Sequence, residues 1–370
     1  MLVQTVSVAW AMTSITGGAA DKVALVQSAT MLPILLLSPI SGSIADIYDR
    51  RRVALMALCI AGIGICALIA LQALNATTPF LLLACCFSIG TGNALFSPTW
   101  QLIAREEVAL HEIPEAIALT SVGYNVARTG GPAIGGMVVA AWGLSAAYFV
   151  AVAALLPAVL TFALRKAESA RPTRKPERLF EAVKAGVRLV VSDRFIRTSL
   201  IQVFIVSTLV SVLQVLGPLV SKDLLASEVG IYGVLMAAFG IGAVAGALAV
   251  GNLRKAFPDA VALTILTVVV GIGCGLVASA RSTLIVLLGY LLAGAAYTAS
   301  AAVVNIGIQV TTERRLNARV LSLYQGVVAG SLAFGGWLWG TVAAHLGTQA
   351  AVAIAAMAAA LAPVIWQRSR

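Results

Sequence analysis

One arginine stands apart from the other charged residues of this sequence. Arg128 is the only charged residue well inside a long apolar stretch, and no Asp or Glu lies inside one. It follows the expected helix start near residue 117 by about eleven residues, or ~16 Å at the helical rise per residue. A charge at that depth of a bilayer faces a cavity or a partner. We expect Arg128 to contact carbonyls, polar side chains or an anionic ligand; a structural hydrogen bond or snorkelling to the interface are the alternatives.

Neutral polar side chains recur on four further apolar stretches, where they can line a cavity for a small molecule. These candidates are Gln4, Ser7, Asn93, Ser97, Gln202, Gln214, Tyr297 and Asn305. For any single one of them, a hydrogen bond between neighbouring helices is the simpler role. Together with Arg128 they form the candidate substrate cavity.

The residue pattern does not support ATP hydrolysis, an enzyme active site, a metal site or binding of nucleic acid. No Gly-rich phosphate loop of the Walker type occurs, which removes ATP as the direct energy source. No Ser/His/Asp arrangement is present, and the five cysteines fall in apolar stretches without the spacing of a metal site. The net charge of +10 comes from basic residues in short loops, so no nucleic acid is expected as a partner. We expect a protein that is not an enzyme and that binds no cofactor and no metal.

The elements that must position these residues are membrane-spanning helices. The chain has 370 residues, of which 60% are hydrophobic and 11% charged, against about a quarter charged in soluble domains. Apolar stretches of roughly 20 residues, the length that crosses a bilayer, recur along the chain. We expect spans at 1–16, 23–45, 53–74, 79–103, 117–142, 146–164, 196–220, 229–252, 260–280, 283–309, 318–343 and 347–366. The first is short for a bilayer, which suggests a first helix that lacks its beginning.

Two halves are expected around a basic linker at residues 165–195. At an offset of 200 residues, Ala118, Tyr124, Gly130, Ala133, Gly135 and Gly136 match Ala318, Tyr324, Gly330, Ala333, Gly335 and Gly336. Such internal repeats are typical of transporters with paired halves. The sequence therefore predicts an all-α membrane protein of twelve transmembrane helices in two pseudo-symmetric six-helix bundles, residues 1–164 and 196–370.

The distribution of basic residues predicts the orientation in the membrane. With alternating spans, 21 Lys and Arg residues fall on the side of the 165–195 linker and three on the other side, while Arg128 lies within a span. Basic loops stay in the cytoplasm. We expect a multi-pass protein of the cell inner membrane with both termini cytoplasmic.

A charged loop separates the second and third spans. Its distinctive residues are Gly42, Asp46, Asp49, Arg50, Arg51 and Arg52. The glycine allows close helix approach, the arginines can bind lipid phosphates, and Asp46 can pair with a helix N-terminus or a neighbouring arginine. A weaker copy lies 204 residues later, where Val250 stands in place of Asp46, so only the first copy is expected to act through a carboxylate.

The fifth span carries a second motif, made of Asn125, Arg128, Gly131, Pro132, Gly135 and Gly136. Glycines let another backbone approach closely, and the proline frees a carbonyl. Ordinary packing of small residues is the alternative reading of this segment.

Together these segments resemble the major facilitator superfamily of transporters. The 42–52 loop resembles the signature between helices two and three, although the family usually has Gly where Asp49 stands. The 131–136 segment resembles the fifth-helix signature of exporters. With residues 4–10, 23–27 and 32–33, the chain resembles the branch that contains enterobactin exporters and macrolide efflux proteins.

The resemblance implies a secondary exporter of siderophores or drug-like molecules that works by alternating access, is coupled to protons, and acts as a monomer in the lipid bilayer. It also implies that Asp46 braces the start of helix eleven, near residues 318–320, as a conformational latch; a mere topology anchor is the alternative. A siderophore would use Arg128, whereas a hydrophobic drug would need mainly the apolar cavity. A non-transporting sensor or remnant, suggested by the short first helix, is the alternative to transport.

Overall fold

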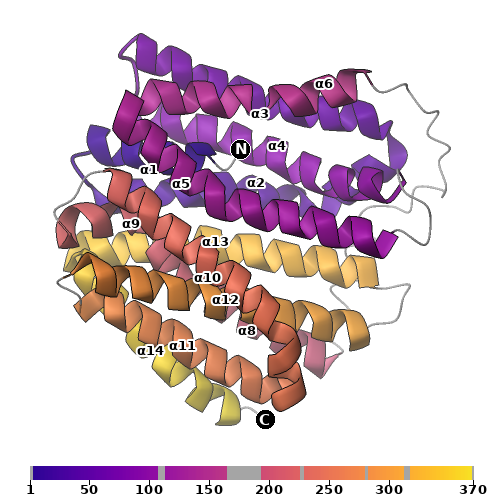
Figure 1. The fold of residues 1–370 in the computed structure, drawn as a ribbon, viewed down its shortest axis with the longest axis vertical. Coiled ribbons are helices and arrows are strands. Elements are labelled where there is room, and N and C mark those ends of the chain that lie inside the picture. Colours follow the sequence, from indigo (N-terminus) through magenta and orange to yellow (C-terminus); the bar gives the residue numbers. More distant parts are fainter. Residues whose placement is uncertain are drawn as a thin grey trace.

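A computed structural model of the chain describes residues 3–106, 113–164, 193–225, 229–279, 282–311 and 317–368. All regular elements in these ranges are helices, and most are long helices that lie side by side (Figure 1). The expectation of an all-α protein is confirmed for this part of the chain. The first group of helices is α1 (Val3–Ile15), α2 (Ala20–Ile47), α3 (Arg50–Ala73), α4 (Pro79–Glu106), α5 (Ile113–Ala153) and α6 (Leu156–Leu164). The second is α8 (Arg194–Val215), α9 (Gly217–Leu219), η2 (Val220–Leu224), α10 (Val229–Ala256), α11 (Asp259–Ser279), α12 (Thr283–Thr311), α13 (Asn317–Leu346) and α14 (Thr348–Arg368).

Nine helical segments among the described residues are long and apolar enough to cross a bilayer. They are Ala20–Ser38, Arg50–Ala73, Pro79–Trp100, Ile134–Leu164, Arg194–Val215, Ile231–Ala256, Asp259–Ser279, Thr283–Ile308 and Leu323–Leu346. Helix α1 has 13 residues, and the apolar part of α14 is the shorter segment Thr348–Ala362. These lengths identify a multi-pass membrane protein, while twelve spans in two bundles stay a prediction.

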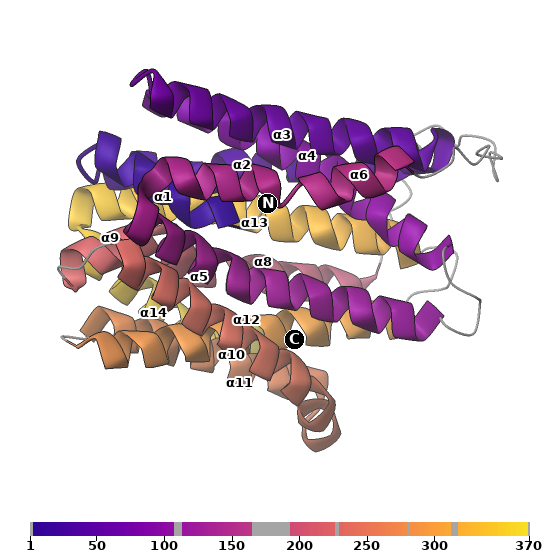
Figure 2. The same cartoon turned by 45° about the horizontal axis from the view of Figure 1, so that its top comes forward.

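Helix α5 bends where the fifth and sixth expected spans meet. Gly143 has φ 81° and ψ 177°, which breaks the helical conformation inside the 41-residue element. Glycine tolerates this positive φ because it has no Cβ. A straight helix of that length would be ~60 Å long, about twice the hydrocarbon thickness of a bilayer. Figure 2 shows the chain reversing direction there, toward α6.

Helix α4 lies between α2 and α3 in the first group. It approaches α2 at Gly90 and α3 at Gly92, where a Cβ atom would lie 2.6 Å from the carbonyl oxygen of Ala57. The buried core of this group is made of aliphatic side chains such as Leu58, Ile65, Leu68, Leu82 and Ile89. Small residues thus permit close backbones, and the large apolar residues fill the remaining space.

Helix α12 is the centre of the second group, because it packs against both α10 and α11. Tyr290 of α12 is fully buried, and its hydroxyl donates a 2.9 Å hydrogen bond to the carbonyl oxygen of Leu213 in α8. The two groups then meet along two seams, one between α2 and α13 and the other between α5 and α10 (Figure 1). These two seams join the two groups of helices. The division into domains at 164 and 196 stays a prediction, since residues 165–192 of the expected linker lie outside the described residues.

Candidate functional site

The charged loop between α2 and α3 is a helix-capping structure. Asp49 precedes α3, and its carboxylate accepts a 2.9 Å hydrogen bond from the backbone N–H of Arg51. An aspartate at this position satisfies an otherwise unpaired N–H of the first helical turn and interacts favourably with the helix dipole. Asp49, which stands where the major facilitator superfamily usually has Gly, therefore fixes where α3 begins.

Arg51 ties this loop to the end of α6. Its Nε donates a 2.7 Å hydrogen bond to the carbonyl oxygen of Phe162, and its Nη2 donates one of 2.6 Å to that of Ala163. The last carbonyls of a helix have no partner within the helix and carry partial negative charge. A guanidinium, with its fork of N–H donors, suits two adjacent carbonyls. Arg51 thus anchors α3 to the last turn of α6, directly before the expected linker.

The other residues of the loop differ in their surroundings. Arg52 is exposed over 85% of its side chain and lies 3.7 Å from Asp49, so this ion pair adds little stability. Arg50 is partly buried at the start of α3. Gly42 and Asp46 lie on α2, but their side-chain environment falls outside the described residues. The contact from Asp46 to the start of α13 therefore stays a prediction.

The second copy of the loop, between α10 and α11, has a carboxylate of its own. Arg254 and Asp259 form a bidentate ion pair, with Nε–Oδ1 at 2.9 Å and Nη2–Oδ2 at 3.1 Å. Val250 stands at the position of Asp46, whereas this acid follows the arginine instead of preceding it. The second copy thus pairs its arginine within its own loop, and the expectation that only the first copy latches through a carboxylate stays a prediction.

The fifth-helix motif lies on the first part of α5, which packs against α1 and α10. Gly131, Gly135 and Gly136 are buried, as expected of residues that allow close packing. The side chains of Asn125, Arg128 and Pro132 lie outside the described residues, so their environment stays a prediction.

Two of the candidate cavity residues meet between α8 and α12. Gln202 and Tyr297 line a small hollow together with Ser207 and Ser300. Its volume of about 10 Å³ is enough for roughly one water molecule and not for a drug-sized ligand. This conformation therefore keeps the two residues close together without room for a substrate between them.

Buried polar atoms without partners mark a second set of candidate ligand groups. Within the described part of the chain these atoms are Gln4 Oε1, Ser7 Oγ, Gln214 Nε2 and Thr298 Oγ1. A buried polar group without a hydrogen bond costs about 1–3 kcal/mol, which a bound substrate or water can recover. The sequence singled out the first three and missed Thr298, although it directly follows Tyr297. Asn93 of α4 and Asn305 of α12 are partly buried, and the structure does not bring all these residues into one hollow.

The seam between α2 and α13 is tightest toward the beginning of α2. Ser28 donates a 2.7 Å hydrogen bond to the carbonyl oxygen of Ala333, and a Cβ atom at Gly340 would lie 2.5 Å from the Cβ of Ala24. Farther along the seam, a Cβ atom at Gly330 of α13 would meet only the side chain of Leu35 of α2, at 3.3 Å from its Cδ1. The backbones are therefore closest at the end of the molecule that contains the α1–α2 turn.

Lys222 closes the same end of the seam. Its Nζ donates a 3.0 Å hydrogen bond to the carbonyl oxygen of Gly17, just past the end of α1. The neighbouring Asp223 accepts a 2.8 Å hydrogen bond from the hydroxyl of Thr348 at the start of α14. Sequence reasoning did not select Lys222, although it is one of the few basic residues expected on the sparsely charged side of the membrane.

Two groups of long apolar helices that meet along paired seams are an arrangement found in membrane transporters. The fold is similar to that of a variant of the nucleoside transporter NupG, with a TM-score of 0.81 over 99% of this chain and 95% of that chain at 13% identity. It is also similar to a POT family transporter solved with 5-aminolevulinic acid, with a TM-score of 0.77 over 99% and 92% of the two chains at 15% identity. At these identities the likeness establishes the fold alone.

The chain belongs to the transmembrane secretion effector family of the major facilitator superfamily, which matches residues 1–370. It is 26% identical to the multidrug efflux pump Tap of Mycobacterium tuberculosis over 323 residues, 83% of this chain and 75% of the pump. It is 26% identical to Tap of Mycolicibacterium fortuitum over 344 residues, 88% of this chain and 80% of that pump. The expected superfamily is confirmed, and the chain is a transporter and a homologue of multidrug efflux pumps, not an enzyme.

Proposed function

We propose that this transporter exports drug-like small molecules across the cytoplasmic membrane, and that a proton gradient drives the export. The observation that carries this proposal is the similarity to the Tap multidrug efflux pumps, which extends over 83% of the chain. Neutral polar groups in an otherwise apolar interior, such as Gln4 and Gln214, suit ligands that are mainly hydrophobic with a few hydrogen-bonding groups. The relatives do not favour the alternative of a non-transporting sensor or remnant.

Alternating access requires the two groups of helices to separate at one end while they close at the other. The contacts of Lys222 with Gly17 and of Gly340 with Ala24 support a closed end at the α1–α2 turn. The charge distribution of the loops favours the outside of the cell for this end. In this proposal, the structure represents a state closed toward the outside, both termini lie in the cytoplasm, and the chain acts as a monomer in the inner membrane.

The latch proposal concerns the opposite end of the molecule. In the outward-open state, Asp46 would contact the start of α13, whose positive dipole end attracts a carboxylate. Arg51 supports this role, because its hydrogen bonds to Phe162 and Ala163 hold the loop against α6. The pair of Arg254 and Asp259 lies in the matching loop of the second group and would stabilise that loop separately.

An anionic substrate, such as a siderophore, is the second candidate. The observation that favours it is Arg128, a cation in the middle of an expected span without an acid in any other span. A negative charge on the substrate would compensate for a cation at that expected depth of the bilayer. Drug and siderophore therefore differ in their expected dependence on Arg128.

The test is efflux from exporter-deficient cells that express the chain, with a panel of drugs and a labelled siderophore compared at equal protein abundance. Export of several drugs that stops when a protonophore is added supports the proposal. Export of the siderophore alone would favour the second candidate. No export of either class, in cells where the protein is present in the membrane, would refute both.

A further inference from the structure

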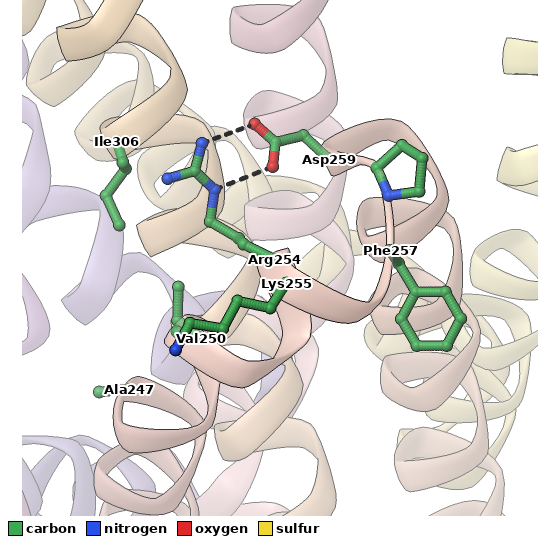
Figure 3. A pocket seen from close by; sticks show the side chains of 9 residues that line it. Ala247, Val250, Arg254, Lys255, Phe257, Asp259 and Ile306 are labelled. Carbon is green, nitrogen blue, oxygen red and sulfur yellow. Dashed lines mark hydrogen bonds and ion pairs between the residues drawn. The ribbon is translucent and has the colours of Figure 1, made fainter.

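An open hollow lies beside the turn between α10 and α11, on the side of α12. It has a volume of about 530 Å³ and lies between the last three turns of α10, the first residue of α11 and Ile306 of α12 (Figure 3). Gly251 opens onto empty space, because a Cβ atom there would meet no other atom within 4 Å. The hollow is thus large enough for a charged headgroup, and Gly251 gives direct access to it.

The position of this hollow is set by the ends of three expected membrane spans. The segments Ile231–Ala256, Asp259–Ser279 and Thr283–Ile308 are each apolar and long enough to cross a bilayer. The hollow lies where the first ends, the second begins and the third nears its end. It therefore lies at the boundary between the hydrocarbon and the lipid headgroups, and not in the path between the two groups of helices.

The charges at the hollow favour an anion. Arg254 uses Nε and Nη2 for its ion pair with Asp259, and its third guanidinium nitrogen points away from that carboxylate (Figure 3). The exposed Lys255 adds a second cation, so that two basic residues and one acid leave a net positive lining. Asp259 holds the guanidinium in one orientation, which reduces the conformational entropy that an anion must overcome on binding.

The other residues of the lining are apolar, and this favours a lipid over a free anion as the ligand. Ala247 and Val250 precede the basic pair on α10, toward the middle of its expected span. Ile306 of α12 lies beside Arg254 (Figure 3), and Phe257 is 41% exposed at the turn. A soluble phosphate would leave this apolar surface in contact with water. An acyl chain would cover it while the phosphate stays next to the basic residues, as at other basic sites for lipid headgroups.

We propose that this hollow binds an anionic phospholipid, with its phosphate between Arg254 and Lys255 and an acyl chain over Ala247 and Val250. The predicted orientation puts the site at the cytoplasmic leaflet, where anionic lipids interact with basic residues near the membrane surface. The site is separate from the proposed substrate cavity. A bound lipid would brace the α10–α11 loop at the end of the molecule opposite Lys222 and Gly17.

The test is native mass spectrometry of the purified full chain with dioleoyl phosphatidylglycerol, dioleoyl phosphatidylcholine or glycerol 3-phosphate. The wild-type protein is expected to retain phosphatidylglycerol more tightly than phosphatidylcholine. Lys255→Gln should weaken the binding of the anionic lipid about five-fold, the effect of one basic residue near the membrane surface. Gly251→Trp should fill the hollow and remove the tightest binding, whereas Gly251→Ala, its matched control, should retain it.

Charge at the other end of the molecule provides a second control. Lys22→Gln removes another exposed lysine, near the start of α2, and should leave the tightest binding unchanged. Equal affinity for the two lipids, or unchanged binding by both Lys255→Gln and Gly251→Trp, would overturn the proposal. Displacement of the lipid by glycerol 3-phosphate at similar concentration would overturn it in favour of a site for free phosphate. Lys255→Gln is at an exposed position, so the test does not depend on the folding of the tryptophan variant.

Discussion

The side chain of Lys222 reaches across from the second group of helices to the first, where its Nζ donates a 3.0 Å hydrogen bond to the carbonyl oxygen of Gly17. Gly17 follows α1 with a positive φ of 65°, a conformation that turns the chain toward α2 and that glycine adopts without strain. The carbonyl lies at the negative end of the α1 dipole, which attracts the ammonium group. This contact closes the same end at which α2 and α13 pack most tightly.

Removal of the Lys222 ammonium group is expected to favour opening at this end. Lys222→Met keeps most of the aliphatic stem and loses the hydrogen bond. The equilibrium between the state in which this end is closed and the state in which it is open should therefore shift about two- to five-fold toward the open state. The measurement is the distance distribution between spin labels at Ser14 and Leu346 in a cysteine-free background. Lys22→Met, at an exposed lysine of the same end, is the control. Identical distributions for Lys222→Met and the unaltered protein would argue against the contact as a closing device.

Arg51 and Arg52 are neighbours with different expected effects on stability. Arg51→Ala leaves the last carbonyls of α6 without their partner and should cost about 1–2 kcal/mol, since Arg51 is partly exposed. Arg52→Ala should change stability by less than about 0.5 kcal/mol, because its ion pair is long and exposed. Thermal unfolding of the two variants in detergent checks this difference. Equal shifts of the melting temperature would contradict the anchoring role of Arg51.

Gly340 leaves no room for a side chain against α2. Gly340→Ala would place a methyl group 2.5 Å from the Cβ of Ala24 and should cost about 1–3 kcal/mol through overpacking of the closed seam. Drug efflux should fall several-fold at normal protein abundance, because one of the alternating states is destabilised. Gly275→Ala is the matched control: its Cβ would meet Ala356 at an ordinary 3.9 Å. Wild-type efflux from both variants would show that the seam does not have to close so tightly.

Arg128 distinguishes the two substrate classes. Arg128→Ala is expected to abolish export of an anionic substrate while protein abundance stays normal, because the substrate loses its counter-charge inside the membrane. Export of a neutral drug should change much less. The measurement is accumulation of both substrate classes in inverted vesicles that contain the variant. Unchanged export of the anion would exclude Arg128 from its binding.

The sequence predicted the helical architecture well where a local signal exists. The alternation of apolar stretches with charged loops anticipated the turn between α2 and α3, and the expected break near residues 142–146 coincides with the bend at Gly143. Such features depend on hydrophobic length and on local turn residues, which a single sequence contains.

Contacts between distant segments were not accessible in this way. Arg51 meets Phe162 across 111 positions of the chain, and Lys222 meets Gly17 across 205. An exposed arginine or lysine has the same local signature whether it binds a carbonyl, a lipid or water. The pair of Arg254 and Asp259 has a different cause. In the second loop the acid follows the arginine, whereas Asp46 precedes the arginines of the first loop, so matching the two loops at a fixed offset does not align the acids.

The central claim is that the chain moves drug-like molecules out of the cell by alternating access, driven by protons. The most direct measurement is accumulation of a fluorescent drug in inverted membrane vesicles on which a pH gradient is imposed, with Asp46→Asn as the variant of the proposed latch. We expect accumulation that requires the gradient and that Asp46→Asn lowers strongly. No accumulation above that of vesicles without the protein would contradict the claim, and wild-type rates from Asp46→Asn would refute the latch.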